Sequence, residues 1–312
     1  MTVRKTSLLE RAGAVYDFGA EMRARRGAID AVAEAPVDVA PDAPTLAAIP
    51  PEFLSNASDD DPVFPDRDPA VALIDRGMLA EQGMIVPGAP VGALAEEFRL
   101  AKRQLLVTQA RVAAADPAKA RTVLVCSARP HDGKTFCAIN LALSLAAERD
   151  LEVLLVDADV AKPDVLGRLG LPQGPGLLDA LADPAVDVET LVMRTDVSGL
   201  SVLPAGARTS SDTELLASAR TRAVIQRLLD ADPRRIVIFD SPPALAASPA
   251  GVLAMLVGQV LLVVRADRTA ESDLAAAVQL LDGCEHMALL LNAVAFVPGG
   301  QRYGYYGQEN RK

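Results

Sequence analysis

The sequence of 312 residues has no tryptophan, only three cysteines and only two histidines, and these scarcities exclude several classes of protein. Cys126, Cys137 and Cys284 all lie inside apolar segments, so the sequence offers no disulfide framework of the kind that small secreted domains use. No spacing of cysteine and histidine resembles a zinc site. We therefore expect the cysteines to be buried, small apolar side chains in a reducing compartment.

A long basic run is also missing, and so is an uninterrupted apolar stretch. The net charge of −10 repels a phosphate backbone, so we expect no nucleic-acid partner. The first 13 residues lack the apolar centre of a signal peptide, and the most apolar stretch, residues 244–264, is broken by polar residues, a proline and a glycine. We expect a cytoplasmic protein, and any association with a membrane must come through a partner.

Composition divides the chain into four parts. Residues 1–34 have the mixed charged and apolar composition of a possible helix. Residues 35–90 hold ten of the 22 prolines and an acidic run, which predicts an extended linker. Residues 91–298 alternate apolar runs with helical patterns and are expected to form the folded domain. Residues 299–312 are a tail rich in glycine and tyrosine.

Six apolar runs in the domain are rich in leucine and β-branched residues and do not alternate with polar ones. The predicted strands are 122–127, 152–157, 200–204, 235–240, 259–265 and 287–292. The helical patterns between them cover 134–149, 213–231, 247–256 and 270–282. Strands buried on both faces indicate a parallel sheet covered by helices. The predicted fold is a doubly wound α/β domain with a mostly parallel sheet.

A phosphate-binding loop is predicted after the first of these strands. Gly133, Lys134 and Thr135 open a helix directly after a strand that ends at Ser127. At such a junction, backbone N–H groups and the helix N-terminus cradle phosphate oxygens, the lysine reaches the β- and γ-phosphates, and the threonine hydroxyl binds Mg²⁺. One departure is Ala128, which stands where the usual pattern has an earlier glycine.

Carboxylates follow two other strands. Asp157 ends the second strand, Asp159 comes two residues later, and Asp240 ends the strand at 235–240. Ligands of open parallel sheets lie beyond the carboxyl ends of the strands, so these three side chains and the phosphate loop are expected to converge there. Each aspartate alone is also explained by helix capping. Together they favour a phosphoryl-transfer site containing Mg²⁺.

These segments carry a resemblance to a known family. GKTFCAINLA, VLLVDADVAKPDV and IVIFDSPP look like the Walker A, Walker A′ and Walker B motifs of the bacterial tyrosine kinases (BY-kinases), which have the P-loop NTPase fold. The resemblance runs from about Ala95 to the C-terminus. It includes AEEFRLAKRQLL, which is similar to a Glu-x-x-Arg-x-x-Arg helix that packs against a neighbouring subunit. Glu96, Arg99 and Lys102 are the corresponding oligomer contacts, with Lys in place of the last Arg.

The resemblance implies an activity and a set of site residues. The activity is ATP- and Mg²⁺-dependent tyrosine autophosphorylation, in trans within a homo-oligomer. The catalytic residues are Lys134, Asp157, Asp159 and Asp240, with Asp157 as the candidate for activating the tyrosine hydroxyl. The Mg²⁺ ligands are Thr135, Asp157 and Asp240. The ATP-binding residues are Pro130, His131, Asp132, Gly133, Lys134, Thr135, Phe136 and Asn292, the last of them at adenine.

Partners are implied by the resemblance in the same way. The sequence is most similar to the autokinases encoded beside exosortase-linked exopolysaccharide genes. Proteins of that group regulate exopolysaccharide synthesis or export together with a membrane chain-length determinant (polysaccharide co-polymerase) protein and a cognate tyrosine phosphatase. The same partners are therefore expected here, and with them a cytoplasmic location that is peripheral at the inner membrane through a partner.

The tail supplies the expected phosphoacceptors. Tyr303, Tyr305 and Tyr306 are three of only four tyrosines in the chain, and the glycines around them disfavour regular structure. A sticky aromatic tail with no substrate role is the alternative. Because the tail follows a domain with a predicted ATP site, the interpretation that its tyrosines are substrates is favoured.

Two other functions remain open at this point. A partitioning or division-site ATPase would carry an extra lysine early in the loop, where this chain has Arg129. The acidic charge and the tyrosine tail disfavour it. A non-catalytic adaptor that binds nucleotide is the second, and the presence of Lys134, Thr135, Asp157 and Asp240 disfavours it. Arg265, at the end of another strand, either positions a charged group of the site or forms a structural ion pair.

Overall fold

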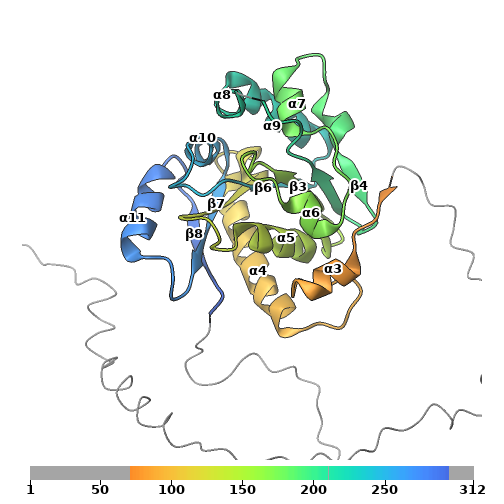
Figure 1. The fold of residues 1–312 in the computed structure, drawn as a ribbon, viewed down its shortest axis with the longest axis vertical. Helices are drawn as coiled ribbons and strands as arrows, with labels where there is room; N and C mark the ends of the chain where they lie inside the picture. Colours follow the sequence, from red (N-terminus) through yellow and green to blue (C-terminus); the bar gives the residue numbers. More distant parts are fainter. Residues whose placement is uncertain (1–70, 210, 295–312) are drawn as a thin grey trace, which may run out of the picture. The chain divides into compact units, whose positions relative to one another are not determined.

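The computed structural model describes residues 71–209 and 211–294, in which a β-sheet lies between two layers of helices (Figure 1). The sheet has eight strands in the order β1-β4-β5-β3-β6-β2-β7-β8. From the central β2, the chain builds the sheet outward in both directions. The neighbouring pairs from β5 to β8 are parallel, and β4 is antiparallel to β5. The prediction of a doubly wound, mostly parallel α/β fold is confirmed.

All six predicted strands are present, and two further strands are too short for a sequence pattern to reveal. The strands are β1 (Val71–Ala72), β2 (Thr122–Ser127), β3 (Glu152–Asp157), β4 (Met193–Thr195), β5 (Leu200–Leu203), β6 (Arg235–Asp240), β7 (Gln259–Arg265) and β8 (Met287–Asn292). β1 has two residues and β4 three, and neither has a buried residue. They extend one edge of the sheet. Because β4 is antiparallel to β5, the sheet is mixed parallel and antiparallel at that edge.

Two hydrophobic clusters hold the helices on opposite faces of the sheet, because alternate side chains of each strand point to opposite sides. Leu124 of β2 belongs to one cluster and Val123 to the other. One face carries α3 (Arg76–Glu81), α4 (Ala93–Ala113), α5 (Lys134–Ala146) and α6 (Val165–Leu169). The other carries α7 (Leu177–Ala182), α8 (Asp212–Leu216), α9 (Ala219–Ala231), α10 (Pro249–Leu256) and α11 (Glu271–Leu280). Short 3₁₀ turns, η3 (Lys119–Arg121) and η4 (Val188–Leu191), complete the connections.

The helix predicted over 213–231 is two helices, α8 and α9. They are separated at Ala217 and Ser218, and Ser218 has an extended backbone with φ −75° and ψ 158°. Its hydroxyl donates to the carbonyl oxygen of Leu215 at 2.7 Å. A serine that bonds to the preceding turn in this way offers the backbone an alternative to a continuous helix.

The folded unit begins earlier than the sequence predicts. Residues 71–90, assigned above to the linker, contain β1 and α3, so the boundary at residue 90 is wrong for this stretch. Ile74, Leu79 and Met84 are 3%, 0% and 5% exposed and belong to the core. The buried side chain of Asn140 in α5 accepts a hydrogen bond from the backbone N–H of Ile85 at 2.7 Å. Proline-rich composition on both sides concealed this short apolar pattern.

Deleting residues 1–90 is therefore expected to destabilise the protein, whereas deleting residues 1–64 is not. The chain divides into units 1–64 and 65–312, so the shorter deletion leaves the second unit whole. The longer deletion removes three buried apolar side chains, each worth about 1.5–3 kcal/mol, and costs roughly 5 kcal/mol. Thermal unfolding of the two truncated proteins measures the difference. Equal melting temperatures would show that residues 71–90 are not part of the core.

Several predicted features lie outside the described residues. They are the possible helix within 1–34, residues 35–70 of the predicted linker, and the tail 299–312. Within 71–209 and 211–294, no helix has both the length and the apolar character needed to cross a membrane. The three cysteines are buried and free, as predicted.

Candidate active site

The loop between β2 and α5 has the backbone of a phosphate-binding loop. β2 ends at Ser127 and α5 begins at Lys134. His131 and Gly133 both have positive φ angles, 68° and 98°. Asp132 is 2% exposed, and its carboxylate accepts a hydrogen bond from the N–H of Arg129 at 3.0 Å, which braces the loop across its width. The N-terminus of α5, with its partial positive charge, faces the same space.

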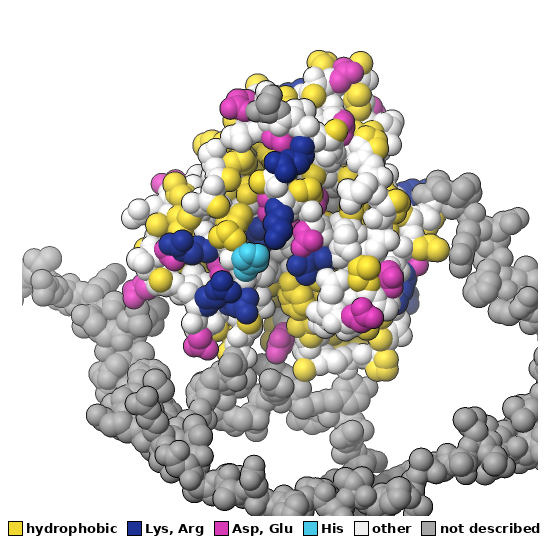
Figure 2. All heavy atoms as spheres, in the orientation of Figure 1, with side chains coloured by type: hydrophobic (Ala, Val, Ile, Leu, Met, Phe, Trp, Pro, Cys, Tyr) yellow, Lys and Arg dark blue, Asp and Glu magenta, His cyan; other side chains and the backbone are white. Residues whose placement is uncertain are grey.

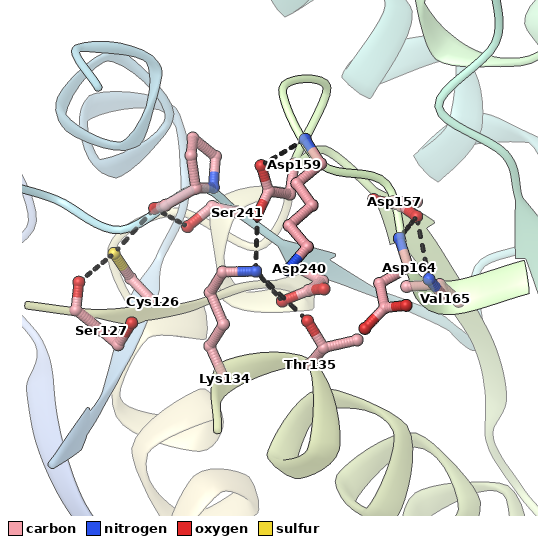
Figure 3. A network of polar contacts seen from close by, with 12 residues as sticks. Cys126, Ser127, Lys134, Thr135, Asp157, Asp159, Asp164, Val165, Asp240 and Ser241 are labelled. Carbon is pink, nitrogen blue, oxygen red and sulfur yellow. Dashed lines mark hydrogen bonds and ion pairs between the residues drawn. The ribbon is translucent and has the colours of Figure 1, made fainter. Parts of the chain in front are cut away.

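Lys134 lies at the centre of the site and points between two aspartates (Figure 3). Its Nζ is 2.7 Å from Oδ2 of Asp159 and 3.7 Å from Oδ1 of Asp240, and it donates to Oγ1 of Thr135 at 3.2 Å. Burial lowers the pKa of the Lys134 ammonium, but the charges of Asp240 and Asp159 more than offset this, so its pKa lies above the ordinary value. The lysine therefore stays charged.

Asp157 and Asp240 stand side by side on neighbouring strands, where they are register partners of β3 and β6. Burial and the nearby charge of Asp240 raise the pKa of Asp157 to about 7. Burial raises the pKa of Asp240 to about 6, although the ammonium of Lys134 opposes the shift. Two buried carboxylates this close share a site in which full ionisation of both is unfavourable without a further cation.

Three buried carboxylate oxygens in this cluster have no hydrogen-bond partner. They are Oδ1 of Asp157 and both side-chain oxygens of Asp240. The other oxygen of Asp157 accepts from the N–H groups of Asp164 and Val165 at 3.1 Å each, at the start of α6. Thus Asp157 caps a helix with one oxygen and offers the other to the site, so the two explanations given above for this residue both apply.

The residues present fit a Mg²⁺ ion. Unpartnered carboxylate oxygens beside the hydroxyl of Thr135 are the hard donors that Mg²⁺ takes from proteins, usually one or two carboxylates together with substrate phosphates and water. Within 71–209 and 211–294, no group of three His, Cys, Asp or Glu side chains is arranged to hold a metal by itself.

One face of the described unit carries a local group of basic side chains although the chain is acidic. In Figure 2, several Lys and Arg side chains lie near the middle of the view, with Asp and Glu side chains among and around them. Such a gathering attracts anionic ligands to a protein of net charge −10.

The other predicted loop residues have more varied surroundings. Phe136 packs against the core beneath the loop. Asn292, at the end of β8, donates from Nδ2 to the carbonyl oxygen of Asp132 at 2.9 Å, so its side chain is directed at the loop backbone. Arg265 donates to the carbonyl oxygen of His131 at 2.9 Å, and Arg129 forms an ion pair with Asp273 of α11. Asp273 is absent from the sequence-based set, because no local motif surrounds it.

The raised pKa values predict an unusual pH dependence of stability. Asp157 and Asp240 bind protons more tightly in the folded protein than in the unfolded chain, so folding takes up protons between about pH 4 and pH 7. The nucleotide-free protein should therefore lose stability as the pH rises through this window and change little above it. Asp157→Asn keeps an oxygen for the helix cap and removes one charge. It is expected to raise the melting temperature at pH 7.5 by roughly 3–6 °C, about 1–2 kcal/mol.

The matched control for this variant is Asp159→Asn, two residues away. Asp159 is the direct partner of Lys134, so this change should lower the melting temperature. Thermal unfolding of both variants between pH 5 and pH 8 gives the signs. A melting temperature of Asp157→Asn that equals or falls below the wild-type value at pH 7.5 would contradict the assigned electrostatics.

Comparison with known proteins agrees with the fold. A family model described as AAA domain matches residues 121–287, which is more than half of the chain. The chain therefore belongs to this AAA domain family of phosphate-loop proteins. The matched region contains the phosphate loop and all three aspartates of the site.

Two known relatives are tyrosine-protein kinases by name. Tyrosine-protein kinase YwqD of Bacillus subtilis (strain 168) is 29% identical over 238 residues, which cover 76% of this chain and 96% of YwqD. The putative tyrosine-protein kinase EpsB of Ralstonia solanacearum is 32% identical over 194 residues, 61% of this chain but only 25% of EpsB. This chain thus corresponds to about a quarter of the longer relative.

Among solved structures, the kinase domain of VpsO has a TM-score of 0.52 and 30% identity, and the likeness covers 63% of this chain and 97% of that one. The predicted resemblance to the bacterial tyrosine kinases is confirmed by these relatives.

Proposed function

We propose that this chain is a protein-tyrosine kinase that transfers the γ-phosphoryl group of ATP to tyrosine side chains. The observation that carries the proposal is the site itself. A charged lysine at the start of α5 pairs with Asp159 and Asp240 beside Asp157, and three buried oxygens of Asp157 and Asp240 lack hydrogen-bond partners. This combination suits a Mg²⁺–triphosphate, whose charge the lysine and the metal offset. The names of the relatives, which are tyrosine-protein kinases, support the choice of acceptor.

The residues take separate roles in this proposal. The loop N–H groups and Lys134 hold phosphate oxygens, and the ammonium leaves Asp159 when it turns to them. Thr135, Asp157 and Asp240 hold Mg²⁺, which supplies charge neutralisation when bound, and Asp159 assists at the metal. Asp157 is also the candidate for accepting the proton of the tyrosine hydroxyl, because its Oδ1 is offered to the site and has no hydrogen-bond partner.

The acceptors in this proposal are Tyr303, Tyr305 and Tyr306 of a neighbouring copy. The described residues end at Val294, so only a short segment separates the last strand from these tyrosines. Phosphorylation of the tail would regulate exopolysaccharide synthesis or export, with a membrane chain-length determinant protein and a tyrosine phosphatase as partners.

One assay tests the proposed activity. The purified full-length protein is incubated with ATP and Mg²⁺, and mass spectrometry locates the phosphate. The proposal requires phosphotyrosine within residues 299–312. Hydrolysis of ATP without any phosphotyrosine would instead indicate a partitioning-type ATPase, and nucleotide binding without either product would indicate an adaptor.

Assembly is proposed to use the exposed face of α4. The side chains of Glu96 and Arg99 are 41% and 52% exposed and form an ion pair with each other at 2.7 Å. Lys102 differs from this expectation. It is 9% exposed, pairs with Glu148 at 2.7 Å and donates to the carbonyl oxygen of Ser144, so it is used inside the chain. The proposed contact is therefore limited to Glu96 and Arg99.

Reversing the charge at this face should reduce assembly. Arg99→Glu places two like charges three residues apart on α4 and removes a cation from the proposed interface, so the average mass in solution should fall toward that of a monomer. Light scattering at equal protein concentration measures this. Arg222→Glu, at an exposed position of α9 on the other side of the sheet, is the control. An equal fall in both variants would assign the effect to net charge.

A further inference from the structure

Two side chains from neighbouring strands hold the phosphate loop from outside. Arg265, the last residue of β7, donates from Nη1 to the carbonyl oxygen of His131 at 2.9 Å. Asn292, the last residue of β8, donates from Nδ2 to the carbonyl oxygen of Asp132 at 2.9 Å. The two residues are register partners in the sheet, so they stand side by side. They bind two successive peptide groups of the loop.

The orientation of these peptide groups follows from their planarity. In a trans peptide, the N–H points opposite to the C=O of the same group. When the carbonyls of His131 and Asp132 are turned toward Arg265 and Asn292, the N–H groups of Asp132 and Gly133 must point to the other side of the loop. Within the described residues, neither N–H has a hydrogen-bond partner. They are available to an anion.

The loop conformation needs this support. His131 has a φ of 68°, in the left-handed region that residues with a side chain rarely adopt. Gly133 has a φ of 98°, and a Cβ added there would lie only 2.0 Å from Nδ2 of Asn292. Glycine is therefore required at 133 for two reasons, its backbone angle and the close approach of the asparagine. The side chain of Asn292 thus occupies the space that a Cβ at position 133 would need.

We propose that Arg265 and Asn292 are positioning residues that hold the N–H groups of Asp132 and Gly133 toward the phosphates of the nucleotide. The inference rests on the proposed function to the extent that the loop binds a nucleotide. It gives Asn292 a role other than the adenine contact that the family resemblance implies. One N–H of the Asn292 amide is bound to the loop and its Oδ1 accepts from the N–H of Ala293, so we expect its influence on binding to pass through the phosphates.

Binding measurements with two ligands separate these roles. Isothermal titration calorimetry of the full-length protein with Mg²⁺ and either ATP or tripolyphosphate, which has no base, gives the affinities. Asn292→Ala should weaken both ligands by a similar factor, about tenfold, the cost of one hydrogen bond that orients a binding group. An adenine contact predicts weaker ATP binding and unchanged tripolyphosphate binding, and that outcome would overturn the proposal. If the wild-type protein binds neither ligand, the proposed function fails instead.

Matched variants remove the remaining ambiguities. Arg265→Ala should also weaken both ligands, whereas Arg268→Ala removes the same charge three residues further on, from an exposed position, and should have little effect. An equal loss in the two would assign the effect to charge alone. Leu291→Ala, beside Asn292 and 65% exposed, controls for changes at the end of β8.

A second measurement does not depend on a ligand. Amide hydrogen exchange of Arg129, whose N–H is bound to the carboxylate of Asp132 in the loop, should become faster in the nucleotide-free Arg265→Ala and Asn292→Ala proteins, with little change in Arg268→Ala. If Asn292→Ala fails to fold, Asn292→Asp replaces it. This variant keeps the oxygen that accepts from the N–H of Ala293 at 2.8 Å but places an acceptor against the carbonyl of Asp132. Exchange and affinity that remain at wild-type values in Asn292→Asp would refute the proposal.

Discussion

Replacing Lys134 by methionine is expected to abolish phosphotyrosine formation and to weaken ATP binding at least tenfold. The ammonium lies 2.7 Å from Asp159 and 3.7 Å from Asp240. Its loss leaves the buried carboxylates without their cation, so a triphosphate would meet uncompensated negative charge. A charged contact to phosphate is also among the stronger hydrogen bonds that a protein makes. Phosphotyrosine immunoblotting and calorimetric titration with ATP measure the two effects.

Lys119→Met is the control for this variant. Lys119 lies just before β2, at the opposite end of that strand from the loop, and its Nζ donates to the carbonyl oxygen of Met255. It carries the same charge but has no contact with the site, so its replacement should leave both activity and ATP affinity near the wild-type values. Autophosphorylation that persists in a folded Lys134→Met protein would exclude the proposed mechanism.

Changing Tyr303, Tyr305 and Tyr306 together to phenylalanine is expected to remove nearly all phosphotyrosine. The variant keeps the aromatic side chains but lacks the acceptor hydroxyls, and it leaves the catalytic residues untouched. It should bind ATP as the wild type does. Each phosphate adds about −1.5 to −2 charges at neutral pH. Several phosphates on a protein of net charge −10, beside the aspartates of a neighbouring subunit, should therefore repel that subunit. The variant should therefore stay assembled in the presence of ATP, whereas the wild type dissociates.

Tyr16 is the internal control, since it is the remaining tyrosine of the chain. Mass spectrometry of the wild type and the triple variant, combined with light scattering before and after ATP addition, gives both outcomes. Undiminished phosphate in the triple variant, located on Tyr16 or on serine, would show that the tail is not the substrate.

Much of the fold could be predicted because its strands are long and buried on both faces. Residues 122–127 and 235–240 were assigned to strands with their observed limits, since an unbroken apolar run bounded by polar residues has few other interpretations. β1 and β4 could not be predicted in this way, because two or three partly exposed residues are too few to show a repeating pattern of apolar and polar positions. The helix break at Ser218 depends on one hydroxyl hydrogen bond, which competes with a strong helical pattern.

The site was predictable for a related reason. Lys134, Asp157, Asp159 and Asp240 all stand at the carboxyl ends of central parallel strands or just beyond them, and the order of a doubly wound sheet brings these ends together. The supporting contacts were not predictable. Asp273 of α11 pairs with Arg129, although the two residues are 144 positions apart in the chain. No local sequence pattern predicts such a pairing. Lys102 was placed at an interface by its motif, whereas its pairing with Glu148 depends on how α4 packs on α5.

The sheet order also separates the two ends of the described unit. β1, the first strand in the sequence, forms one edge of the sheet, and β8, the last, forms the other. With about 4.8 Å between neighbouring strands, the two edges stand roughly 30 Å apart. A partner that contacts the described unit at β1 is therefore about the full width of the sheet away from the end of β8. In the proposed kinase, a docking contact at the edge formed by β1 would leave the edge formed by β8 accessible.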